Sequence, residues 1–208
     1  MLTPSKLLFL PGISGDTSFW RPVADLLAHP AAKVHLGWPG FGPTPADPEV
    51  AGIDDLVARV LGEIDQPSAL IAQSMGGVIA VLAALARPDL VTHLVLTATS
   101  GGIDTSGLGV SDWRPGFLRA NPNLPAWFIT YKPDLAADLG RIAAPALLLW
   151  GDADPISPVA VGRRLAQLLP RAALHVIPGG AHDLALVHAA RVAPLIAAHL
   201  AKSAASGD

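Results

Sequence analysis

The segment Ala69–Ala86, ALIAQSMGGVIAVLAALA, is an apolar run that is interrupted by a glutamine, by Ser74 and by two glycines. Short apolar runs bounded by turn residues are typical of buried strands, and longer runs are typical of helices. We therefore predict a strand at 68–72, a tight turn and a helix at 75–86. A serine in such a strand-to-helix turn presents its hydroxyl above the end of the sheet.

The residues around Ser74 fit the steric demands of a tight turn. Residues two positions before and after the serine must be small, and they are Ala72 and Gly76. Ser74 also precedes a helix, whose first N–H groups favour negative charge, so the N–H of Met75 could bind a developing oxyanion. This segment alone leaves one alternative open to a functional role of Ser74. In that alternative, the turn is an ordinary one and the serine caps the helix.

Composition restricts the classes of function. Of the 208 residues, 51% are hydrophobic and 15% are charged; the net charge is −3, and there is no cysteine. Disulfides and thiolate sites are therefore excluded. The lack of a basic cluster argues against nucleic acid as a partner, and no apolar run reaches the length of a membrane span. The start has no features of a signal peptide, so we expect a single cytoplasmic domain over residues 1–208.

Short apolar runs alternate with helical patterns along the chain. The predicted strands are 7–10, 33–36, 68–72, 93–97, 146–150 and 173–177. The predicted helices are 19–27, 53–64, 75–86, 158–169 and 184–200. This alternation predicts an α/β fold with about six mostly parallel strands and helices on both faces. Ligands of such sheets bind beyond the carboxyl ends of the strands.

Residues 101–142, here called the cap segment, break this alternation. They are rich in turn residues and also contain five aromatic residues, and a long irregular segment of this kind is uncommon unless it is functional. The aromatic side chains could anchor the segment to the core, cover a pocket, or do both. The candidate pocket residues, for which core packing is the alternative, are Ile13, Trp20, Met75, Trp113, Phe117, Trp127 and Phe128.

Two further loops carry reactive side chains at the ends of predicted strands. Asp152 and Asp154 follow the strand at 146–150, and His182 follows the strand at 173–177. Each residue alone is explained by turn or capping chemistry. Together with Ser74 they give the chain order serine, acid, histidine, which is the order of the triad in α/β-hydrolases.

From these residues the chain resembles the α/β-hydrolase superfamily along nearly its whole length. AQSMGG resembles the nucleophile elbow, and GGAHDL resembles the loop of the catalytic histidine. WGDADPISP is similar to a Gly-x-x-Asp turn, which selects Asp154 as the acid. LFLPGISGDTSFW resembles the oxyanion loop, with Pro11 in place of the usual histidine, and implies the N–H of Ile13 as the second donor. GWPGFGPT departs from the family pattern because Gly37 replaces an aspartate.

The resemblance implies a compact serine hydrolase with a short cap segment. It would cleave carboxylic esters or thioesters of small apolar substrates through an acyl-serine, without a metal or cofactor. A C–C bond hydrolase or a lyase with the same triad remains an alternative, although Asp183 stands where hydroxynitrile lyases commonly have lysine. A small-molecule receptor on a hydrolase scaffold is a third interpretation. The sequence leaves the oligomeric state open.

Overall fold

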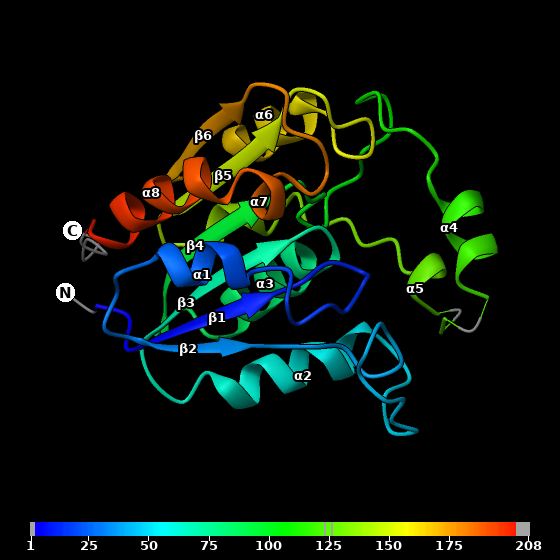
Figure 1. Ribbon diagram of the computed structural model, residues 1–208, viewed down its shortest axis with the longest axis horizontal. Helices are drawn as coiled ribbons and strands as arrows, with labels where there is room; N and C mark the ends of the chain where they lie inside the picture. The colour runs from blue at the N-terminus through cyan, green and yellow to red at the C-terminus, as the bar shows by residue number, and fades with distance from the viewer. Residues whose placement is uncertain (1–2, 123, 126, 203–208) are drawn as a thin grey trace.

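A six-stranded parallel sheet forms the centre of the protein (Figure 1). The computed structural model describes residues 3–122, 124–125 and 127–202. The strand order is β2-β1-β3-β4-β5-β6, and every neighbouring pair is parallel. The strands are β1 (Lys6–Leu10), β2 (Ala32–His35), β3 (Ser68–Gln73), β4 (Val91–Thr97), β5 (Ala146–Gly151) and β6 (Ala172–Ile177). The expected strand count is confirmed, and the observed sheet is entirely parallel.

Helices cover both faces of the sheet because successive strand residues point to opposite faces. Leu8 and Leu10 of β1 pack in the core under α2, α3 and α6, whereas Leu7 and Phe9 pack in the core under α1, α7 and α8. The helices of these two layers are α1 (Arg21–Leu26), α2 (Ile53–Glu63), α3 (Met75–Ala86), α6 (Val159–Leu168), α7 (Leu184–Val187) and α8 (Ala189–Leu200).

The last helical region differs from its prediction. A single helix was expected over 184–200, but the chain forms α7 and α8 with a break at His188. The backbone of His188 leaves the helical region, with φ −107° and ψ 33°. Its N–H donates to the carbonyl of Leu184, and its own carbonyl accepts from the N–H of Arg191. The apolar periodicity continues through the break, so it gives no sign of this change of direction.

The cap segment lies apart from the two helical layers, on the side toward which the strand arrows point (Figure 1). It contains α4 (Arg114–Ala120), α5 (Trp127–Thr130) and the 3₁₀ helix η1 (Leu139–Arg141). Residues 123 and 126 of the predicted cap segment lie outside the described residues. Neither α4 nor α5 has a buried residue, and both are short. The segment is therefore positioned by contacts with loops and aromatic side chains more than by a core of its own.

Two buried histidines couple the sheet to α8. His93 of β4 and His199 of α8 are 1% and 3% exposed, and their rings meet edge to face with centroids 5.2 Å apart. Burial lowers the pKa of His199 to about 4. Repulsion from Lys202, and from His93 when that ring is protonated, acts in the same direction. Burial also lowers the pKa of His93. Folding therefore requires the neutral form of both rings near neutral pH.

This pair predicts a loss of stability as the pH falls. In the unfolded chain His199 titrates near its ordinary pKa of about 6.5, so between that value and about 4 the unfolded state binds more protons. The contribution of the neutral His199 ring to the free energy of unfolding is therefore complete above about pH 6.5. On the order of 2 kcal/mol of this contribution is lost by about pH 4.5. Thermal unfolding of wild type and His199→Leu across this range measures the effect, and the variant should show a shallower decline of Tm.

A matched control uses the exposed His175 of β6. His175→Leu should keep the wild-type dependence of Tm on pH. An equal decline in wild type and His199→Leu would show that His199 does not contribute to the acid sensitivity.

Candidate active site

Ser74 lies in the turn between β3 and α3 with a backbone conformation that side chains rarely adopt. Its φ is 52° and its ψ is −120°. Ala98, which follows β4, is the other non-glycine residue with positive φ among those described, at 47°, and it lines the same cavity as Ser74. Backbone strain of this kind costs about 1–3 kcal/mol per residue and persists only where the surrounding structure enforces it.

The first turn of α3 packs directly against the end of β1. A Cβ atom at Gly76 would lie against the carbonyl oxygen of Pro11 and 2.7 Å from that of Leu10. A Cβ atom at Gly77 would lie 2.6 Å from the Cβ of Thr99. The predicted need for a small residue at position 76 is therefore explained by the backbone of β1.

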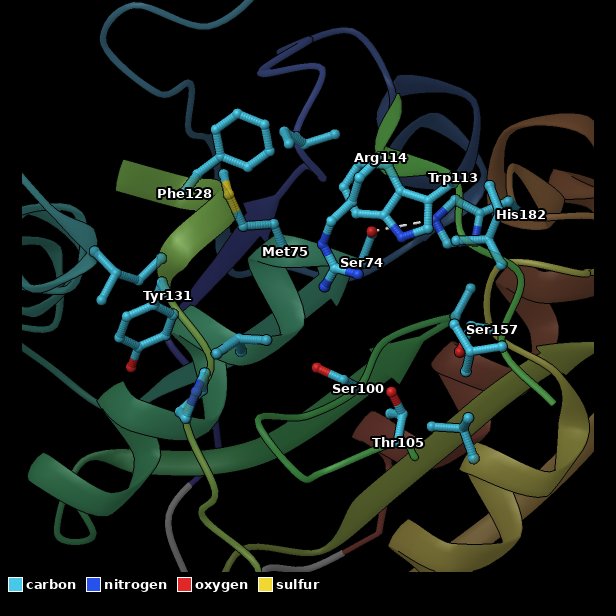
Figure 2. A pocket seen from close by; sticks show the side chains of 18 of the residues that line it. Ser74, Met75, Ser100, Thr105, Trp113, Arg114, Phe128, Tyr131, Ser157 and His182 are labelled. Atoms are coloured by element: carbon cyan, nitrogen blue, oxygen red, sulfur yellow. Dashed lines mark hydrogen bonds between the residues drawn. The ribbon is translucent and has the colours of Figure 1, made fainter. Parts of the chain in front are cut away.

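A hydrogen-bonded chain joins three side chains from three loops, and Figure 2 shows its link between Ser74 and His182. The Oγ of Ser74 is 3.1 Å from Nε2 of His182, and Nδ1 of His182 is 2.8 Å from Oδ2 of Asp154. An ionised carboxylate only accepts hydrogen bonds, so this arrangement assigns the imidazole proton to Nδ1 and leaves Nε2 to accept from the serine hydroxyl. The arrangement can therefore withdraw a proton from Ser74.

Asp154 is held in place by backbone N–H groups of its own loop. Its side chain is fully buried, and Oδ1 accepts the N–H groups of Ile156 at 2.8 Å and Ser157 at 3.1 Å. Asp152 has a different position, because its Oδ1 accepts the N–H of Gly179 at 2.7 Å. Asp152 thus ties the loop after β5 to the loop after β6, and Asp154 is the carboxylate that contacts the histidine.

The loop after β1 carries Ile13, one of the two predicted oxyanion donors. The Nε1–H of Trp38 donates to the carbonyls of Pro11 and Gly12, each at 3.0 Å. Met75, the other predicted donor, is the first residue of α3, whose initial N–H groups have no partner within the helix. Both residues line the same cavity as Ser74.

The cavity has a volume of about 170 Å³ and is bounded by the sheet loops and the cap segment (Figure 2). Three predicted aromatic residues line it: Trp113, Trp127 and Phe128. Phe117 does not line it but packs edge-on against Trp113 and Phe128, with ring centroids 5.5 and 6.3 Å away. Phe117 therefore supports the aromatic wall from behind.

Trp20 lies elsewhere in the structure than predicted. Its indole is 1% exposed, packs with Phe9 and Phe19 in the core beneath α1, and donates to the carbonyl of Leu10 at 3.0 Å. The expectation that Trp20 forms a pocket wall is therefore corrected to a support of the loop after β1. Its position at the start of the predicted helix 19–27 did not distinguish these two roles.

Sequence reasoning missed several polar residues of the cavity. Ser100 follows β4, while Thr105, Arg114 and Tyr131 belong to the cap segment. Burial and the charge of Asp54 raise the pKa of Tyr131. Arg114 directly follows Trp113, a predicted pocket residue, and precedes a proline that favours a helix start. This position was the signal in the sequence that could have indicated Arg114 as a cavity residue.

The described residues contain no group of three or more His, Cys, Asp or Glu side chains that could hold a metal ion. None of the helices within them is long and apolar enough to cross a membrane.

Comparison with known proteins identifies the family. Residues 7–139 match the profile of the alpha/beta hydrolase family, and residues 120–189 match a profile of the alpha/beta hydrolase fold. The chain therefore belongs to the alpha/beta hydrolase family, and its parallel sheet with flanking helices is the α/β hydrolase fold.

Curated relatives and solved structures agree with this assignment. The chain is 29% identical to pimeloyl-(acyl-carrier protein) methyl ester esterase of Chromobacterium violaceum, over 80% of this chain and 83% of that protein. It is also 29% identical to 2-hydroxy-6-oxononadienedioate/2-hydroxy-6-oxononatrienedioate hydrolase of Paraburkholderia phymatum, over 87% of this chain and 80% of that protein. A bacterial membrane phospholipase A has the same fold, with a TM-score of 0.80 and 23% identity over 95% of this chain and 78% of that chain.

The packing of Gly76 gives a test of the turn. Gly76→Ala should destabilise the protein by roughly 1–3 kcal/mol, because the added methyl group meets backbone atoms that cannot move aside alone. Gly62→Ala is the matched control, since Gly62 lies in α2 and a Cβ atom there would have open space around it. That control should gain about 0.5–1 kcal/mol from helix propensity. Urea unfolding of both variants measures the difference, and equal stability would contradict the close contact.

Proposed function

We propose that this protein is a serine hydrolase that cleaves carboxylic esters or thioesters of small substrates. The observation that carries the proposal is the hydrogen-bonded chain from Asp154 through His182 to Ser74, which ends at a cavity. The esterase among the relatives supports the choice of an ester bond, while the substrate itself is left open by that similarity.

The proposed reaction begins with Ser74 as nucleophile and His182 as general base. Nε2 takes the hydroxyl proton as Oγ forms a bond with the carbonyl carbon, which gives a tetrahedral oxyanion. Asp154 holds the imidazole in orientation and stabilises its charged form. The N–H groups of Ile13 and Met75 donate to the oxyanion.

The second half of the reaction returns the enzyme to its starting state. The oxyanion collapses, the bond to the leaving group breaks, and His182 donates its proton to the departing alcohol or thiol. A water molecule then enters, loses a proton to the same nitrogen and attacks the acyl-serine. Breakdown of the second tetrahedral intermediate releases the acid and restores the Ser74 hydroxyl.

A C–C bond hydrolase is the second candidate. The observation that favours it is the similarity to the Paraburkholderia phymatum hydrolase, which matches this chain at the same identity as the esterase. Both candidates use the same three side chains, so the bond that is cleaved distinguishes them. Parallel assays with a short methyl ester and a vinylogous 1,5-diketone acid separate the two activities.

Replacing the nucleophile tests the proposal. Ser74→Ala should lower kcat/KM for short activated esters by about 10⁴-fold or more, because no oxygen remains to form the acyl-enzyme. Circular dichroism and Tm should stay close to wild type, since alanine keeps the Cβ atom. Ser5→Ala, at an exposed serine before β1 and at the end of that strand opposite the oxyanion loop, is the control and should keep wild-type turnover.

Covalent labelling gives an independent measurement. A fluorophosphonate should add one equivalent to the wild-type protein, and peptide mapping should locate the adduct on Ser74 and not on other serines. Unchanged ester turnover in Ser74→Ala, together with no adduct on Ser74, would exclude the proposed mechanism. A receptor on the same scaffold would instead label once and release product far more slowly than an enzyme.

A further inference from the structure

Arg114 brings a positive charge to the wall of the cavity. It is the first residue of α4, and it lines the same cavity as Ser74 and His182. Figure 2 shows its side chain directed inward from the cap segment, toward Ser74 and Met75. Its Cζ atom lies 5.3 Å from the centroid of the Trp113 ring, so the guanidinium rests on an aromatic surface.

No acidic side chain in the described part of the chain forms an ion pair with this guanidinium. Among the described residues, the side chain of Arg114 makes no hydrogen bond or ion pair, and no Asp or Glu lines the cavity. Two acidic side chains of the cap segment have other partners: Asp138 pairs with Arg141 at 3.0 Å, and Asp104 accepts from Ser106. Arg119 and Lys132 of the cap segment are exposed to solvent, whereas Arg114 is half-buried and brings its planar set of donors to the cavity.

The surroundings of Arg114 favour an anion over a neutral ligand. The cavity wall is largely apolar, with Ile13, Val78, Val110 and Phe128 among its residues. A charge interaction is stronger beside such groups than in water, and a guanidinium without a counter-charge loses hydration there. Its fork of N–H groups matches the two oxygens of a carboxylate, which can accept two parallel hydrogen bonds.

We propose that the site selects substrates with a second, free carboxylate, which Arg114 binds while the scissile carbonyl lies at Ser74. This inference rests on the proposed function, since it names the class of ester that the same site accepts. The volume of about 170 Å³ limits the substrate to a short chain between the two groups. The substrate class is therefore the half-esters or half-thioesters of short dicarboxylic acids.

A pair of substrates with equal carbon count in the acyl part tests this selection. Monomethyl glutarate carries the second carboxylate, and methyl pentanoate ends in a methyl group at the same position. We expect kcat/KM of the wild-type protein to be at least about tenfold higher for monomethyl glutarate than for methyl pentanoate. A difference of this size corresponds to the contribution of a hydrogen bond between charged groups. Released acid is followed by titration at constant pH in low salt, where attraction between charges is least screened.

Variants at position 114 assign the preference to this side chain. Arg114→Gln should lower the ratio of the two kcat/KM values by about tenfold or more, and Arg114→Glu should reverse the preference. Arg114→Lys keeps the charge without the planar fork, so it should fall between wild type and Arg114→Gln. Arg119→Gln, an exposed position on the same helix, should keep the wild-type ratio.

The outcomes separate this inference from the proposed function. A wild-type preference for methyl pentanoate, or an unchanged ratio in Arg114→Gln, overturns the carboxylate site even if Ser74 is the nucleophile. If neither ester is hydrolysed, glutarate binding to wild type and Arg114→Gln is measured by calorimetry. Binding that requires Arg114 supports the carboxylate site although the proposed reaction fails, and no binding to the wild-type protein overturns the site as well.

Discussion

The contact between the first turn of α3 and the end of β1 is the constraint on which the site depends. Because Gly76 lies against the carbonyls of Leu10 and Pro11, α3 begins without a spacer after β3. The chain can make this connection only through the strained backbone of Ser74. The same contact brings the start of α3 beside the loop that carries Ile13. A single close approach therefore positions the serine and both predicted oxyanion donors.

Two tryptophans support this arrangement from opposite faces of the sheet. Trp20 donates to the carbonyl of Leu10 from the layer of α1, and Trp38 donates to the next two carbonyls from the layer of α2 and α3. Buried indole N–H groups need a partner, and these strand-end carbonyls need a donor. The loop is thus held by groups that are also part of the hydrophobic core, so its shape does not depend on a ligand.

Much of the sheet and of the hydrogen-bonded chain from Asp154 to Ser74 could be predicted from the sequence, because both follow from local patterns. Apolar runs marked the strands to within two residues, and the carboxyl ends of parallel strands meet at one edge, which brought Ser74, Asp154 and His182 together. The break at His188 was missed because apolar spacing continues through it. Trp20 was misplaced because an aromatic residue after a loop fits a core or a pocket equally well. The direction of Arg114 depends on tertiary contacts of the cap segment, which has no periodicity to interpret.

The structure divides its parts between a rigid sheet edge and a separate insertion. The side chains of the hydrogen-bonded chain belong to loops that directly follow strands of the sheet. In contrast, Arg114, Trp113 and Phe128 all belong to the cap segment. Under the proposed function, changes in the cap segment would alter which molecules are recognised while leaving the geometry at Ser74 intact. In evolutionary terms, the chemistry can be inherited while the recognition diverges, and an exchanged cap segment would be a practical route to new specificities.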